Sequence, residues 1–216
     1  MRQNTFNLPV LFSASVILLV VEFIAVVIIS RTGLHPLVVI GLARTAQAAS
    51  FLIIIRMWGG GLASIGVTVS GIANGLKKGL IWSAGFGLCA AFILAVLYFL
   101  NINLQKIFTA PTSGSMTGLV LFFVVGGLIS PVAEEIFFRG ILYGFLRRWG
   151  VFLAVLGSTI AFSIVHGLTS GVSFIQVVGG LVFAVAYEVE KNLLVPIIIH
   201  VLGNTAILVL AILLAS

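Results

Sequence analysis

Long apolar segments follow one another along most of this chain, and they constrain its fold more than any other feature. Of its 216 residues, 61% are hydrophobic and only 7% are charged, whereas a soluble domain carries about 25% charged residues. A helix needs about 20 residues to cross a bilayer, in which every backbone polar group must find a partner within the protein. Segments of suitable length run approximately over Leu8–Ser30, Pro36–Ile55, Leu80–Leu100, Gly118–Leu146, Val151–Leu168, Val172–Tyr187 and Leu193–Ala215.

These seven segments predict an all-α fold, a polytopic membrane helical bundle. A division of the last segment at Gly203 would raise the number of transmembrane helices from seven to eight. The first segment is long enough to span, so we interpret it as a transmembrane helix and not as a cleavable signal. We expect residues 1–216 to form a single integral membrane domain, whose motif-bearing core covers about 118–215.

The stretch Leu62–Leu76 has a different pattern from the spanning segments. Its apolar residues recur at helical spacing on one stripe, and its polar residues lie largely elsewhere. This pattern predicts an amphipathic helix in the membrane surface. The glycines within the stretch leave a re-entrant segment as the alternative.

Basic residues outside the segments indicate the orientation of the chain. The set that falls on one side is Arg2, Arg56, Lys77, Lys78, Arg147, Arg148 and Lys191, and the other side has Arg31 and Lys106. The positive-inside rule therefore places the N-terminus in the cytoplasm, with the cell membrane as the location in a prokaryote. Because the net charge of +6 is spread over short loops, we expect membrane lipid and not nucleic acid around this chain.

Two adjacent acids, Glu134 and Glu135, lie inside the fourth segment together with Arg139. A charge at the bilayer centre costs about 2.5–3.5 kcal/mol on insertion scales, so charged residues at this depth usually serve a function. The simpler alternative is a buried ion pair that joins two helices. Since Glu135 and Arg139 are four residues apart with the acid first, they are spaced to pair on one helix face. Glu134 points about 100° away, so we assign Glu135 a structural role and Glu134 a chemical one.

Polar residues also lie within two later segments. His166 follows Phe162 by four residues in the fifth segment, and His200 and Asn204 share one helix face in the last segment. A rise of about 1.5 Å per residue places Glu134, His166 and His200 about 12–22 Å from the cytoplasmic ends of their helices. This range permits the three residues to form one site. Pro131 and Pro196 precede the site residues, where a proline can kink a membrane helix.

Glu22 and Arg44 are the remaining charges at membrane depth. Each lies about 20 Å from the predicted cytoplasmic end of its segment, by helix rise. We interpret them as a buried structural ion pair between the first two helices.

The pattern Glu134-Glu135-x-x-x-Arg139, Phe162-x-x-x-His166 and His200-x-x-x-Asn204 resembles the motif set of one family. This is the CPBP family of intramembrane proteases, which includes CAAX prenyl proteases and bacteriocin-processing proteins. The resemblance covers Gly126 to about Asn204. It implies a helical bundle and an intramembrane endopeptidase of the glutamate type.

The same resemblance assigns roles to the motif residues. Glu134 would be the general base on a water molecule, assisted by His166, and His200 with Asn204 would form the oxyanion hole. Glu135, Arg139 and Phe162 would support the site. The implied substrate is a peptide or protein, of which a lipid-modified C-terminus is the type case, and no cofactor or metal is implied.

The residue types themselves suit amide hydrolysis, which needs an activated water and donors for the oxyanion. A zinc protease is an alternative, because a carboxylate and two imidazoles are catalytic zinc ligands, although no H-E-x-x-H motif occurs. Cys89 is the only cysteine, which excludes a Cys-based metal site. Two non-enzymes also remain. One is a transporter or proton relay, although the chain has no internal repeat. The other is a bacteriocin-immunity or peptide-binding membrane protein.

Overall fold

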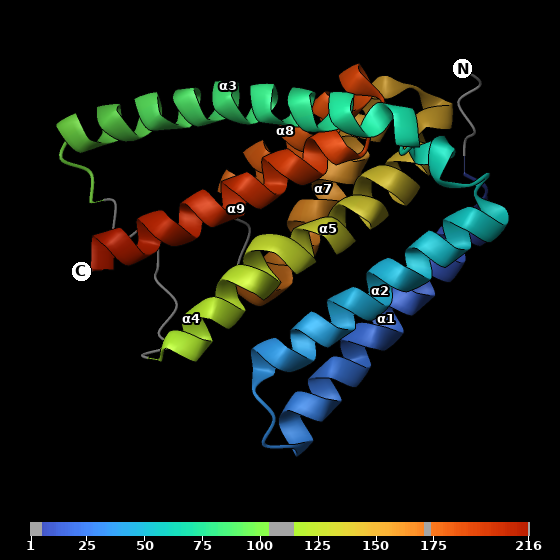
Figure 1. Cartoon of the computed structure of the whole chain (residues 1–216), viewed down its shortest axis with the longest axis horizontal. Coiled ribbons are helices and arrows are strands. Elements are labelled where there is room, and N and C mark those ends of the chain that lie inside the picture. The colour runs from blue at the N-terminus through green and yellow to red at the C-terminus, as the bar shows by residue number, and fades with distance from the viewer. Residues whose placement is uncertain (1–5, 104–114, 171–173, 216) are drawn as a thin grey trace.

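The computed structural model describes residues 6–103, 115–170 and 174–215. Within these ranges the chain forms helices and no strand (Figure 1). In chain order the elements are α1 (Leu8–Arg31), α2 (Pro36–Trp58), the short 3-10 helices η1 (Leu62–Ile65) and η2 (Val69–Gly71), α3 (Ile72–Phe99), a continuous helical run over Met116–Trp149, α7 (Val151–Ser170), α8 (Phe174–Glu190) and α9 (Leu194–Ala215). Arg2 and Lys106 of the charge count, and the expected segment start at Val172, lie outside the described residues.

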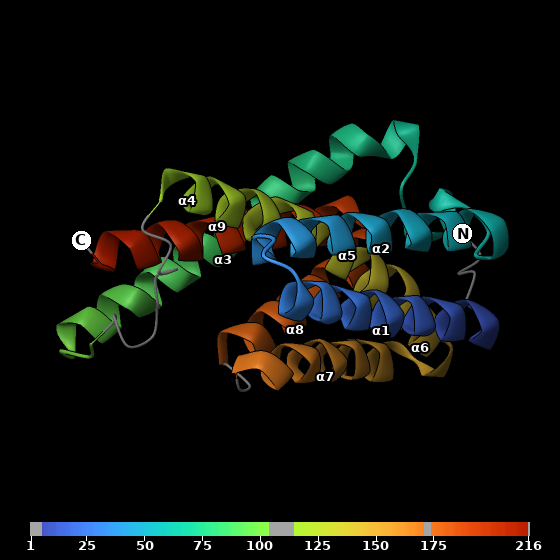
Figure 2. The ribbon, with the colours of Figure 1, turned by 90° about the horizontal axis from the view of Figure 1, so that it is seen from below.

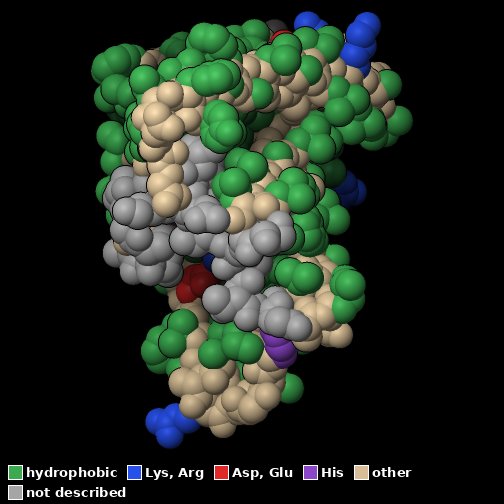
Figure 3. Space-filling view, turned by 90° about the vertical axis from the view of Figure 1, so that its left-hand side faces the viewer, with side chains coloured by type: hydrophobic (Ala, Val, Ile, Leu, Met, Phe, Trp, Pro, Cys, Tyr) green, Lys and Arg blue, Asp and Glu red, His purple; other side chains and the backbone are tan. Residues whose placement is uncertain are grey.

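Five helices in the described part of the chain are long and apolar enough to cross a membrane. They are Leu8–Arg31, Pro36–Trp58, Leu62–Phe99, Met116–Trp149 and Leu194–Leu214, and Val151–Gly167 is a shorter apolar helix. Figure 3 shows hydrophobic side chains over much of one face, with lysine and arginine at its margins. Such a surface is suited to contact with lipid. The predicted all-α, polytopic membrane bundle is confirmed.

The run Met116–Trp149 occupies the middle of the bundle (Figures 1 and 2). It consists of α4 (Met116–Phe122), the π-helix η4 (Phe123–Ile129), α5 (Ser130–Glu135), the π-helix η5 (Ile136–Tyr143), α6 (Gly144–Leu146) and the 3-10 turn η6 (Arg147–Trp149). The α1–α2 hairpin packs on one side of this run, α9 on another, and α7 with α8 against η5. α3 packs along α9.

Buried aromatic rings fill the core around η5. Phe137 contacts Phe51 of α2, with ring centroids 5.4 Å apart, and Phe138 contacts Phe162 of α7 at 5.2 Å. Because only Ile136 separates these phenylalanines from the two acids, this packing fixes η5, and hence the end of α5, between two neighbouring helices.

The prediction of an amphipathic helix over Leu62–Leu76 is wrong. The stretch forms η1 and η2, and α3 begins only at Ile72. The reason is Gly66, whose φ of +78° is left-handed and interrupts the helix. A Cβ at this glycine would lie 2.0 Å from the carbonyl oxygen of Lys191. The close approach lets the N–H of Leu193 donate to Ile65 and attach the segment to the α8–α9 turn.

The last segment forms one continuous helix, α9, without a division at Gly203. Pro196 lies in the first turn of α9, where the N–H groups have no intrahelical partner, so this proline breaks no hydrogen bond of the helix. The described residues therefore contain seven helical segments besides η1 and η2.

Candidate active site

A proline shapes the helix that carries the two acids. In η4 the N–H of Ser130 donates to Val125, which is the wide spacing of a π-helix. The next donor in that register would be residue 131, but Pro131 has no N–H. The carbonyl of Gly126 is thereby left for Asn204, whose Nδ2 donates to it at 2.9 Å. This bond joins α9 to the central run.

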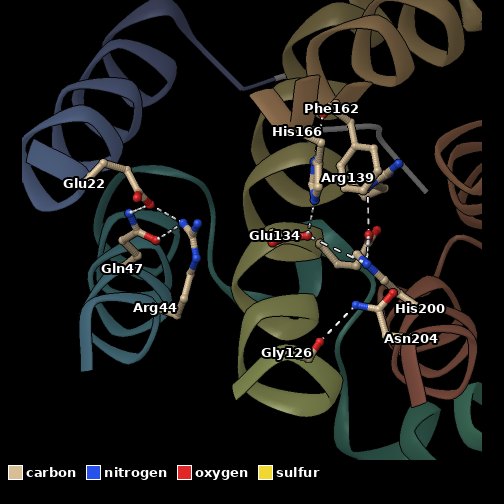
Figure 4. A network of polar contacts seen from close by, with 11 residues as sticks. Glu22, Arg44, Gln47, Gly126, Glu134, Arg139, Phe162, His166, His200 and Asn204 are labelled. Carbon is tan, nitrogen blue, oxygen red and sulfur yellow. Dashed lines mark hydrogen bonds and ion pairs between the residues drawn. The ribbon is translucent and has the colours of Figure 1, made fainter. Parts of the chain in front are cut away.

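Glu134 lies where three helices meet (Figure 4). Its Oε2 is 3.5 Å from Nε2 of His166 on α7 and 3.7 Å from Nε2 of His200 on α9. Both distances exceed those of a direct hydrogen bond, so the two rings lie around the carboxylate without bonding it directly. Only 13% of the Glu134 side chain is exposed.

His166 has a defined hydrogen-bonding state. Its Nδ1 lies 3.0 Å from the carbonyl oxygen of Phe162, one turn earlier on α7. Because a carbonyl oxygen only accepts, we assign a proton to Nδ1, so that Nε2 is an acceptor when the ring carries no second proton. This acceptor faces the carboxylate of Glu134. A water molecule has two protons to donate, so the pair can hold one between them.

Glu135 is fully buried and points in another direction from Glu134. Its Oε1 accepts from Nη1 of Arg139 at 2.7 Å, so the predicted ion pair is confirmed. The same oxygen lies 2.8 Å from Nδ1 of His200, a contact that the sequence analysis did not include. The buried guanidinium of Arg139 also donates to the carbonyl of Gly180 at 3.0 Å and lies over the ring of Phe162, 4.7 Å from its centroid.

His200 is held by contacts on three sides. Its ring stacks on Phe183 of α8 at 4.5 Å, its Nδ1 contacts Glu135 and its Nε2 faces Glu134. Asn204 lies one turn further along α9, and one of its two amide protons bonds Gly126. The other proton of this NH2 group can be donated to a bound molecule.

The structure thus brings together all the motif residues singled out in the sequence. It adds three partners that sequence reasoning missed, namely the carbonyls of Gly126 and Gly180 and the ring of Phe183. A sequence signal existed for Gly126 alone, because Pro131 removes a donor from the helix. The other two depend on how α8 packs, which no local pattern reports.

A second polar network joins α1 and α2 beside this cluster (Figure 4). Arg44 binds Glu22, as predicted, and also Oε1 of Gln47 at 2.8 Å. The pair is not buried as expected, since 41% of the Glu22 side chain and 21% of the Arg44 side chain are exposed. Gln47 is the buried member, and it donates to the Leu18 carbonyl at 3.3 Å.

Among the residues that the structure describes, no group of three or more His, Cys, Asp or Glu side chains is arranged to hold a metal ion. The cluster around Glu134 can instead do three things. Two acceptors can hold and deprotonate a water, a ring nitrogen and an amide can face a developing oxyanion, and an ion pair with aromatic rings fixes the geometry.

The chain is similar to known proteins over part of its length. The family model described as type II CAAX prenyl endopeptidase Rce1-like matches residues 116–206. Over these residues, the chain is similar to that family. The match covers the central run, α7, α8 and most of α9, which are the elements that carry the site.

A Bacillus subtilis (strain 168) relative bears the name "Putative membrane peptidase YdiL". It is 33% identical over 91 residues, which make up 42% of this chain and 37% of the relative. The chain therefore aligns with little more than a third of that protein's length. No solved structure matches this chain significantly. The matching family model and this relative are both named for peptidases.

Proposed function

We propose that this protein is an intramembrane endopeptidase of the glutamate type. The observation that carries the proposal is the convergence on one oxygen, Oε2 of Glu134, of Nε2 atoms from two histidines on two different helices. A carboxylate and a neutral imidazole that face each other across 3.5 Å suit the activation of a water molecule.

In the proposed reaction, water is held between Glu134 Oε2 and His166 Nε2. Glu134 takes a proton while the water oxygen attacks the carbonyl carbon of the peptide. The oxyanion of the tetrahedral intermediate accepts hydrogen bonds from His200 and from the second amide proton of Asn204. The C–N bond then breaks, and the proton on Glu134 passes to the leaving nitrogen.

For the substrate we propose a peptide or protein segment, with a lipid-modified C-terminus as the type case for this family. A lipid chain can remain among the acyl chains while the peptide enters the site from the side. Two features support this route. The outer helix faces are apolar, and the site lies at membrane depth, about 12–22 Å from the proposed cytoplasmic ends of its helices.

The test is cleavage of a farnesylated reporter peptide by purified protein in H2¹⁸O, with and without prolonged chelation. We expect cleavage that survives chelation, with one ¹⁸O atom in the new carboxyl group. Loss of cleavage on chelation, restored by zinc alone, would favour a zinc protease. Binding of the peptide without any cleavage would favour an immunity or peptide-binding protein and would contradict the proposal.

A further inference from the structure

His200 lies between two carboxylates. Its Nδ1 is 2.8 Å from Oε1 of Glu135, and its Nε2 is 3.7 Å from Oε2 of Glu134. The ring is only 3% exposed and is stacked on Phe183 at an angle of 23°. The other charged or titratable groups around it are Arg139 of η5, which binds the same oxygen of Glu135, and His166 of α7, which faces Glu134.

We propose that Glu135 is a positioning residue, which orients His200 and holds it doubly protonated so that Nε2 can donate a hydrogen bond. The proposal rests on the proposed peptidase function for its catalytic meaning. It changes the role of Glu135 from a partner of Arg139 alone to a part of the machinery that stabilises the oxyanion.

The first argument is the direction of the hydrogen bonds. An ionised carboxylate only accepts, so Nδ1 of His200 must donate to Glu135. A neutral ring has a single N–H, and Nε2 would then carry a lone pair. That lone pair would face the acceptor oxygens of Glu134 and could not bind an oxyanion. Only the doubly protonated ring can bond Glu135 and donate from Nε2 as well.

The second argument is the balance of charge in a buried cluster. Two carboxylates, Glu134 and Glu135, face one guanidinium, that of Arg139, which leaves one negative charge in excess. Buried charges require neutralisation, and at membrane depth this requirement is strong. A protonated His200 supplies the missing positive charge. It is better placed than His166, whose Nδ1 faces a neutral carbonyl.

The third argument is that Arg139 and His200 contact the same oxygen of Glu135. Both strong contacts of Glu135 go to Oε1, since Oε2 has no hydrogen-bond partner among the described residues. Arg139 therefore fixes the carboxylate for His200, and its guanidinium lies over the Phe183 ring on which His200 stacks, 5.3 Å from the centroid. The pair with Arg139 thus serves the orientation of His200.

Glu135→Gln tests this inference because glutamine keeps the acceptor oxygen and removes the charge. We expect kcat to fall by about 10²-fold, as for a lost oxyanion donor, with KM little changed. Glu188→Gln is the control. It removes an ion-paired carboxylate outside the site, so it should lower stability and leave kcat unchanged.

A second measurement reports the protonation of His200 directly and does not require catalysis. In full-length protein with ¹⁵N-labelled histidine, the His200 signals are assigned by their loss in His200→Asn. We expect both ring nitrogens of His200 to be protonated at neutral pH, and one to be deprotonated in Glu135→Gln. A singly protonated His200 in an active enzyme would overturn this inference alone. A doubly protonated His200 in a protein that cleaves nothing would support it and refute the peptidase.

Discussion

The adjacent residues Glu134 and Glu135 have the same side chain but different surroundings in this site. Glu134 faces two imidazole nitrogens across gaps of 3.5 and 3.7 Å, whereas Glu135 is fully buried and makes two direct bonds. The Glu134 carboxylate makes no direct hydrogen bond to either ring and can still accept one from a reactant, whereas the Glu135 carboxylate is already bonded. We therefore propose that chemistry and support are divided between these two positions, because successive residues of a helix point in different directions.

Asn204 provides a prediction at the same scale. We expect Asn204→Ala to lower kcat by about 10²–10³-fold, because it removes a proposed oxyanion donor and the bond to Gly126. The measurement is reporter cleavage under saturating substrate. Thr205→Ala, the next position on α9, is the matched control and should retain activity. Equal loss in both variants would mean that packing of α9, and not the amide, is what matters.

At the scale of elements, Pro131 leaves the carbonyl of Gly126 in the central run without a helical donor, so that this carbonyl can accept from Asn204 of α9. Pro131→Ala restores an N–H that can bond Gly126 within the helix, so that Asn204 loses its partner. We expect kcat to fall by about 10–100-fold, because a displacement of about 1 Å in a site can cost that much, while the protein still folds. Pro196→Ala, which restores an N–H in the first turn of α9, should change little. Indistinguishable kinetics for the two variants would contradict this role of Pro131.

A second prediction at this scale concerns the ends of the central run and α8. Glu188 lies beyond the apolar part of α8 and binds Arg147 through both carboxylate oxygens, with Lys191 at 2.5 Å. Burial alone would raise its pKa, but hydrogen bonds from Arg147, Lys191 and Tyr143 lower the pKa to about 2. The resulting stabilisation is complete above the ordinary pKa of 4.5 and is lost as the pH falls toward about 2.

Thermal unfolding of the wild type and of Glu188→Gln measures this effect. We expect the wild type to have the higher Tm at pH 7, and the difference between the two to shrink by pH 3. A difference that is the same at both pH values would show that the carboxylate stabilises the fold through packing and not through its charge.

An element or contact can be predicted from the sequence when nearby residues determine it, and cannot when it depends on packing against a distant part of the chain. The bilayer requires long apolar helices, so α1, α2 and the central run begin and end within a few residues of the expected positions. The bond between Glu135 and Arg139 is equally local. The contact from His200 to Glu135 spans 65 residues of sequence and depends on how α9 packs against α5. The glycine conformation that interrupts Leu62–Leu76 likewise forms against a distant turn, at Lys191.

At the scale of the whole molecule, orientation determines which side supplies water and substrate. We predict that the α1–α2 loop lies outside and the end of the central run inside. In a background with Cys89→Ser, Trp149→Cys should react with an impermeant thiol reagent from the cytoplasmic side only. Gly33→Cys, which is also exposed, should react from the opposite side only. The reverse labelling would overturn both the orientation and the proposed cytoplasmic entry of substrate.

The central claim is that the carboxylate of Glu134 activates the water that cleaves the peptide. The most direct measurement is the rate of reporter cleavage by Glu134→Gln, compared with the wild type at equal amounts of folded protein. Glu22→Gln, which changes the acid of the separate α1–α2 network, is the matched control. We predict no detectable cleavage by Glu134→Gln, with an unchanged Tm, and full cleavage by Glu22→Gln. Cleavage by Glu134→Gln at the rate of the wild type would contradict the account.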